Sequence, residues 1–266
     1  MQNISLNLQG QAPNASMKLF LLPNSDEVEP SRKRPIILIF PGGGFDFLSF
    51  REAKPVALKM LSLGYHAAVL DYALKPEPFP AQLLQGMKAV SALRQNADEY
   101  GIDKDKIVLM GFSAGGHVAA SLGVFWSKPF YSKQLGLTTE DVKPNAMCLG
   151  YPVLTAGPYA HEGSIRALCG KGKDRLTISL ELQVDSETPP AFLFHTVGDD
   201  VVPVENSLLF AKQLKLYRVP FEMHLFQEGP HGMSLGNREV YPDGSEFIDL
   251  PFSNWVKLFD AWLKRL

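Results

Sequence analysis

The sequence lacks the features that mark several large classes of protein. It has only two cysteines, Cys148 and Cys169, in 266 residues, which excludes a disulfide framework and favours a reducing, cytoplasmic setting. No apolar run approaches the roughly 18 residues of a membrane span, and the first residues do not form a secretion leader. Lys and Arg number 26 against 28 Asp and Glu, with no basic stripe. We therefore expect no membrane segment and no nucleic-acid partner.

Metal-ligand spacing is also missing, because no cysteines and histidines cluster as zinc ligands do. What remains is an ordinary globular composition, with 45% hydrophobic and 20% charged residues. The length suits one α/β domain covering residues 1–266. A segment of little strand character, 155–190, lies between two expected strands and is predicted to form a small inserted flap.

Short apolar runs alternate with stretches of helical periodicity through the middle of the chain. Strands are expected at residues 4–8, 17–22, 35–40, 65–70, 107–110, 145–151, 191–196 and 221–226, and helices over 52–63, 81–100, 114–126, 204–217 and 254–266. This alternation predicts an α/β fold with a mostly parallel sheet and helices on both faces. In such sheets the functional site gathers at the carboxyl ends of the strands.

The most informative motif is Gly111-Phe112-Ser113-Ala114-Gly115, which follows an apolar run directly and precedes a helix of small residues. A strand, a sharp turn carrying a serine and then a helix form the context of a nucleophile elbow. Glycine on each side removes the Cβ atoms that would clash in so tight a turn. Ser113 is therefore the candidate nucleophile.

A serine nucleophile needs a base and a group that orients the base. His231 lies in a glycine-flanked loop after the last expected strand and is the candidate base. The loop after the preceding strand carries two adjacent acids, of which we favour Asp199 as the orienting carboxylate. The alternative for Asp200 is a carboxylate at a helix start or facing solvent. The order serine, aspartate, histidine is that of α/β-hydrolases. His117, one helical turn beyond the serine, is expected to pack beside the elbow.

Three consecutive glycines follow the strand at 35–40, in Pro41-Gly42-Gly43-Gly44-Phe45. Backbone N–H groups of Gly43, Gly44 and Ala114 are the candidate donors to a developing oxyanion. A plain glycine-rich turn is the alternative. A phosphate-binding loop is disfavoured, since neither Gly-Lys-Ser/Thr nor G-x-G-x-x-G is present.

Taken together, these motifs resemble the α/β-hydrolase esterase/lipase family, and most nearly its small acetyl-esterase members, which are described as acetyl-xylan esterase-like or carboxylesterase-like. The matching segments are residues 41–45, 71–72, 111–117, 188–195, 198–207 and 229–233. The resemblance implies an α/β-hydrolase fold with a central eight-stranded sheet. It also implies an esterase without a cofactor, in which Ser113, Asp199 and His231 form the triad.

Three departures from the family accompany the resemblance. Pro41 stands where many relatives have a histidine, which leaves the backbone donors intact. Gln85 stands where relatives often have an aspartate, and we expect it to affect local packing. About 35 residues precede the first buried strand, so no large cap is expected.

The sequence therefore predicts a carboxylic-ester hydrolase that acts through an acyl-enzyme on short-chain, acetyl esters, with acetylated sugars as the implied substrates. Its partner is a small-molecule ester, and a homodimer is a further prediction. The alternatives are a serine peptidase and a non-catalytic binding protein on the same fold. The expected pocket walls are Phe45, Phe47, Tyr151, Pro152 and Met233, with the equal alternative that the aromatic residues among them belong to the core.

Overall fold

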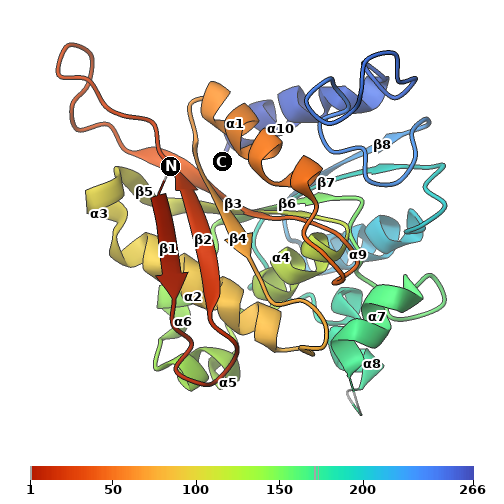
Figure 1. The fold of residues 1–266 in the computed structure, drawn as a ribbon. Helices are drawn as coiled ribbons and strands as arrows, with labels where there is room; N and C mark the ends of the chain where they lie inside the picture. The colour runs from red at the N-terminus through yellow and green to blue at the C-terminus, as the bar shows by residue number, and fades with distance from the viewer. Residues whose placement is uncertain (1, 171, 173) are drawn as a thin grey trace.

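An eight-stranded sheet with the order β1-β2-β4-β3-β5-β6-β7-β8 runs through the molecule (Figure 1). The computed structural model describes residues 2–170, 172 and 174–266. Strands β1 and β2 join antiparallel at one edge, and β2 is also antiparallel to β4, while the remaining neighbours are parallel. This confirms the predicted mostly parallel, eight-stranded sheet. The strands are β1 Gln2–Leu6, β2 Ala15–Phe20, β3 Arg34–Phe40, β4 His66–Asp71, β5 Ile102–Phe112, β6 Ala146–Gly150, β7 Ala191–Thr196 and β8 Phe221–Phe226.

Helices cover both faces of the sheet (Figure 1). The longer ones are α1 Lys54–Ser62 and α10 Trp255–Leu263 on one face, with α2 Ala81–Gln95, α4 Ala114–Phe125 and α9 Glu205–Leu216 on the other. Short helical turns are η1 Phe50–Glu52, α3 Ala97–Tyr100, α5 Pro129–Ser132, η2 Lys133–Leu135, α6 Thr139–Val142, α7 Glu162–Cys169, α8 Arg175–Ile178, η3 Leu180–Leu182 and η4 Pro251–Asn254. Among the described residues, no helix has the length and apolar character that a membrane crossing requires.

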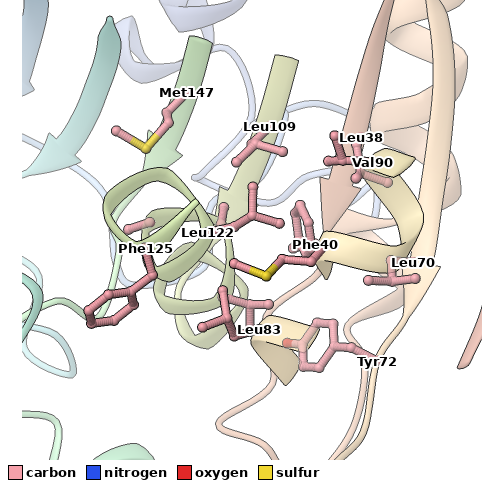
Figure 2. Packing of buried hydrophobic residues seen from close by; sticks show 14 of the residues in the cluster. Leu38, Phe40, Leu70, Tyr72, Leu83, Val90, Leu109, Leu122, Phe125 and Met147 are labelled. Atoms are coloured by element: carbon pink, nitrogen blue, oxygen red, sulfur yellow. The ribbon is translucent and has the colours of Figure 1, made fainter. Parts of the chain in front are cut away.

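Two apolar cores lie on opposite faces of the sheet, and the period of the strands explains them. In β3, Ile36, Leu38 and Phe40 point to the face covered by α2 and α4, while Ile37 and Ile39 point to the face covered by α1 and α10. Figure 2 shows the first face, where strand residues meet side chains from α2 and α4. Each fully buried aliphatic side chain stabilises the fold by about 1.5–3 kcal/mol. Because both faces of β3 are buried, its sequence is a continuous apolar run.

The structure differs from the expected boundaries where the local sequence carries no signal. β5 begins at Ile102, five residues before the expected Ile107, because Ile102 pairs with Arg34 of β3. The residues between Ile102 and Ile107 are charged and mostly exposed, so they gave no strand signal. The helix expected over 81–100 ends at Gln95, and α3 follows after Asn96. Segment 155–190 carries α7, α8 and η3, and its residues 171 and 173 lie outside the described ones.

The parallel strands all end at one edge of the sheet, and this edge collects the predicted functional residues. Gly43 follows β3, Ser113 follows β5, Asp199 follows β7 and His231 follows β8. Four segments far apart in the sequence thus supply one site.

Candidate active site

Ser113 occupies a strained turn between β5 and α4. Its backbone has φ 53° and ψ −122°, a conformation that residues other than glycine rarely adopt. A Cβ on Gly115 would lie 2.0 Å from the carbonyl oxygen of Phe40, and one on Gly111 would lie 2.4 Å from that of Gly115. The two glycines are therefore required because β3, β5 and α4 approach one another closely at the elbow.

A chain of hydrogen bonds links the three predicted side chains. Ser113 Oγ lies 2.8 Å from His231 Nε2, and His231 Nδ1 lies 2.7 Å from Asp199 Oδ2. Because the ionised carboxylate accepts, His231 donates from Nδ1, and its Nε2 is left to accept the proton of the serine hydroxyl. Asp199 is buried, whereas Asp200 is exposed. The structure thus brings together the serine, the histidine and the favoured one of the two acids.

The Asp199 carboxylate is held ionised by several donors. Oδ1 accepts the backbone N–H groups of Val201 at 3.0 Å and Val202 at 2.8 Å. Burial alone would raise the pKa of Asp199, but hydrogen bonds from His195, His231 and Val202, with the charge of His231, hold it well below its usual value. A carboxylate that stays ionised can fix the tautomer of His231 and stabilise the imidazolium.

His195 also contacts this carboxylate, and sequence reasoning treated it only as a strand residue. Its Nε2 lies 3.0 Å from the carbonyl oxygen of Val202, so Nε2 carries a proton, and the same atom lies 3.2 Å from Asp199 Oδ2. Ser207 Oγ lies 2.8 Å from the other nitrogen, Nδ1, which accepts the hydroxyl proton. His195 is fully buried. Asp199 Oδ2 is therefore shared between two imidazoles.

The glycine loop after β3 presents unpaired donors beside the serine. Gly43 has φ 126°, and a Cβ there would lie 2.0 Å from the carbonyl oxygen of Phe47, so only glycine fits. Bonds from Asp46 N to Gly43 O at 3.0 Å and from Ser49 N to Gly42 O at 2.9 Å close the loop. Within the described residues, the N–H groups of Gly43, Gly44 and Ala114 have no hydrogen-bond acceptor.

The buried carboxylate of Glu52 binds the backbone of this loop, and nothing in the sequence pointed to this role. The residue is 3% exposed, and its Oε2 accepts the N–H of Gly42 at 2.8 Å. Its Oε1 accepts the hydroxyl of Tyr151 at 2.7 Å, and that hydroxyl in turn accepts the N–H of Ser234 at 2.9 Å. The Tyr151 ring lies edge-on to His231, with centroids 5.1 Å apart. Burial and the Glu52 carboxylate raise the pKa of Tyr151 well above its usual value, so it remains a donor.

A cleft of about 300 Å³ opens over the serine. Of the expected walls, Phe47 lines it, whereas Phe45, Tyr151 and Met233 are buried in the cores and Pro152 is buried against α4. The interpretation of those four as walls was wrong, because aromatic and apolar residues near the loops pack under the site. The lining residues are Gly43, Gly44, Asp46, Phe47, Ser49, Arg51, Glu52, Ser113, His161, Val201, His231 and Gly232. In the described part of the chain, no three His, Cys, Asp or Glu side chains converge as metal ligands would.

Two residues outside the candidate triad, His117 and Gln85, make structural contacts that fit their expected parts. His117 is buried beside the elbow, and its Nε2 lies 2.9 Å from the carbonyl oxygen of Ile178, as the prediction of a packing role required. Gln85 accepts the N–H of Ala73 at 2.7 Å and donates to the carbonyl of Pro13 at 2.7 Å, so it holds loops together.

Two family models match the chain. The one described as BD-FAE matches residues 24–153, which contain the glycine loop and Ser113. The one described as the prolyl oligopeptidase family matches residues 169–248, which contain Asp199 and His231. The two halves of the candidate site thus fall in separate matches.

Solved structures extend the similarity along nearly the whole chain. An acetyl ester-xyloside bifunctional hydrolase from Caldicellulosiruptor lactoaceticus is 35% identical with a TM-score of 0.81, covering 94% of this chain and 88% of that one. The chain belongs to the α/β-hydrolase esterase family. Another α/β-hydrolase, a carboxylesterase from Lactobacillus plantarum, is 28% identical with a TM-score of 0.89, covering 99% of this chain and 96% of that one.

Curated relatives in the α/β-hydrolase esterase family are longer than this chain. An acetylxylan esterase from Xylanibacter ruminicola is 28% identical over 272 aligned positions, which cover 98% of this chain and 51% of that protein. The chain spans about half or less of the length of the curated relatives it matches.

Proposed function

We propose that this protein is a serine esterase that hydrolyses short-chain carboxylic esters, with acetylated sugars as its substrates. The observation that carries the proposal is the chain from Ser113 through His231 to Asp199, lying beside unpaired backbone N–H groups. The geometry suits acyl transfer, because a nucleophile, its base and the donors for an oxyanion all meet at one cleft.

In the proposed mechanism, His231 Nε2 takes the proton as Ser113 Oγ attacks the ester carbonyl carbon. The N–H groups of Gly43, Gly44 and Ala114 stabilise the negative charge on the carbonyl oxygen, each worth on the order of 10²–10³ in rate. The C–O bond then breaks, and the imidazolium returns the proton to the leaving alcohol. Water, deprotonated by His231, attacks the acyl-enzyme and releases the acid. Asp199 orients His231 throughout.

The cleft supports short acyl groups and polar alcohols. Its volume is about 300 Å³, and Asp46, Arg51 and His161 line it with polar groups that suit a polar alcohol. Similarity to an acetyl ester-xyloside hydrolase and to an acetylxylan esterase supports the same substrate class.

Hydrolysis of p-nitrophenyl acetate, butyrate and octanoate by the wild type and Ser113→Ala tests the proposal. We expect kcat to fall at least about 10³-fold in Ser113→Ala, and wild-type kcat/KM to decline with chain length. Unchanged activity in Ser113→Ala would remove the assigned nucleophile. Comparable rates on acetate and octanoate would contradict the short-acyl preference.

A serine peptidase is the second candidate, favoured by the match of residues 169–248 to the prolyl oligopeptidase family. The same three side chains would serve, with an amine as leaving group. Chromogenic dipeptide amides tested beside p-nitrophenyl acetate separate the two candidates, and we expect turnover of the ester alone. A cytoplasmic location and homodimerisation stay predictions.

A further inference from the structure

His161 stands at the junction between the cleft and segment 155–190. It is the N-cap residue of α7, and its Nδ1 accepts the backbone N–H of Ser164 at 3.3 Å, with Ser164 Oγ 2.8 Å away. A backbone N–H can only donate, so Nδ1 carries no proton. In the neutral ring the proton is therefore on Nε2, for which the described residues supply no acceptor.

The His161 ring is neutral and lies beside the catalytic groups. Burial and the charge of His231 lower its pKa, outweighing the smaller opposite effect of Asp199. The side chain lines the same cleft as Ser113 and His231. A neutral imidazole with Nε2–H is a fixed hydrogen-bond donor at the mouth of the site.

The chain around His161 is anchored before any ligand binds. The buried Asn206 donates to the carbonyl of Tyr159 at 2.9 Å and accepts the N–H of Thr155 at 3.0 Å. On the other side, Arg175 pairs with Glu162 at 2.7 Å. Because the chain is held on both sides of His161, the Nε2–H donor is pre-organised, which lowers the entropic cost of binding.

An apolar surface completes the cleft. Phe47 lines it with 60% of its surface exposed, although an aromatic ring is usually covered. A pyranoside presents hydroxyl groups at its rim and C–H bonds on its faces, so it suits a cleft that combines an exposed ring with polar donors.

We propose that His161 is a substrate-binding residue whose Nε2–H donates a hydrogen bond to a hydroxyl of the leaving alcohol. The esterase then prefers acetyl esters of polyhydroxylated rings over those of plain rings of the same size. This inference rests on the proposed esterase function.

The test compares a mono-O-acetylated methyl xylopyranoside with cyclohexyl acetate, whose ring has the same size and no hydroxyl groups. Asparagine places its amide oxygen where Nδ1 was, so His161→Asn keeps the acceptor that caps α7. Its shorter side chain has no donor at the position of Nε2. Glutamine places its amide N–H where Nε2 was, so His161→Gln keeps the donor and loses the cap acceptor. Arg166→Gln, exposed on the same helix, is the matched control.

We expect the ratio of kcat/KM on the xyloside to that on cyclohexyl acetate to fall about 3- to 10-fold in His161→Asn, mainly through KM. The ratio should stay near the wild-type value in His161→Gln and in Arg166→Gln. A normal ratio in His161→Asn with a lowered one in His161→Gln would assign His161 a capping role and overturn the inference. A wild type that hydrolyses neither ester would overturn the proposed function itself.

Discussion

Asp199 and Asp200 are neighbours in the chain and opposites in environment. Asp199 is buried, with His231, His195 and two backbone N–H groups around it, whereas Asp200 is exposed. We predict that Asp199→Asn lowers kcat on p-nitrophenyl acetate about 10³- to 10⁴-fold, because an amide cannot hold the required tautomer of His231. Asp200→Asn, the matched control, should stay within about twofold, since its exposed side chain takes no part in the hydrogen bonds between Ser113, His231 and Asp199. Equal losses in both variants would remove Asp199 as the orienting group.

Sequence reasoning found residues whose chemistry is carried by local motifs and missed those defined by contacts that only the folded chain makes. Ser113 lies in an elbow and His231 in a glycine-flanked loop, so both were visible in short windows. His195 was not, because it meets Asp199, Val202 and Ser207 only once the chain after β7 folds back onto the strand. Glu52 was not visible either. Glu52 reaches the N–H of Gly42 across ten residues and the hydroxyl of Tyr151 across 99. No local pattern encodes such pairs.

At the scale of elements, α4 and segment 155–190 are joined through one buried imidazole. His117 on α4 bonds to the carbonyl of Ile178 at the end of α8, and Ser121 Oγ lies 3.2 Å from its other nitrogen. Burial lowers the pKa of His117 to about 4, against 6.5 for the ordinary side chain. Between these two values the unfolded chain binds a proton that the folded chain does not. The contribution of the neutral His117 side chain to stability is therefore complete above pH 6.5 and is lost as pH falls toward 4.

We predict that His117→Gln, which keeps a donor for Ile178 and does not titrate, flattens this dependence. Between pH 7.5 and pH 5 the wild type should lose about 2 kcal/mol more of its free energy of unfolding than the variant. Urea unfolding at a series of pH values measures the difference. Ser121→Ala is the control, because it removes a partner of His117 and retains the titrating ring. Parallel curves for wild type and His117→Gln would refute the assignment.

Element boundaries show the same division between local and distant signals. β7 and β8 were predicted to the residue, because β7 is mostly a continuous apolar run and β8 alternates apolar with polar residues from Phe221 to Leu225. The first five residues of β5 were missed, since the exposed charges from Asp103 to Lys106 hide a pairing with β3 that only the assembled sheet reveals. Likewise, α7 and α8 are short, and distant residues bond to the chain beside them: Asn206 to the carbonyl of Tyr159 ahead of α7, and His117 to that of Ile178 at the end of α8.

At the scale of the whole molecule, the sheet separates its outer edge from its site. β1 and β2 close one edge, while the functional loops follow β3, β5, β7 and β8. Leu8, just beyond β1, is fully buried in the core on the face covered by α2 and is not among the residues that line the cleft. The overall α/β architecture was predictable because alternating strands and helices allow few arrangements. This architecture leaves stability and activity free to vary independently.

We therefore predict that Leu8→Ala lowers the free energy of unfolding by about 3 kcal/mol, through lost burial and the cavity left behind. Its kcat/KM on p-nitrophenyl acetate should stay within about twofold of wild type at a temperature where both are folded, because the strands that carry the site are unchanged. Leu58→Ala, on the exposed side of α1, controls for substitution alone and should change stability by less than about 0.5 kcal/mol. Loss of activity in fully folded Leu8→Ala would mean that packing at this edge sets the geometry of the distant loops. The sheet would then transmit strain from β1 to the site, and stability and activity would not vary independently.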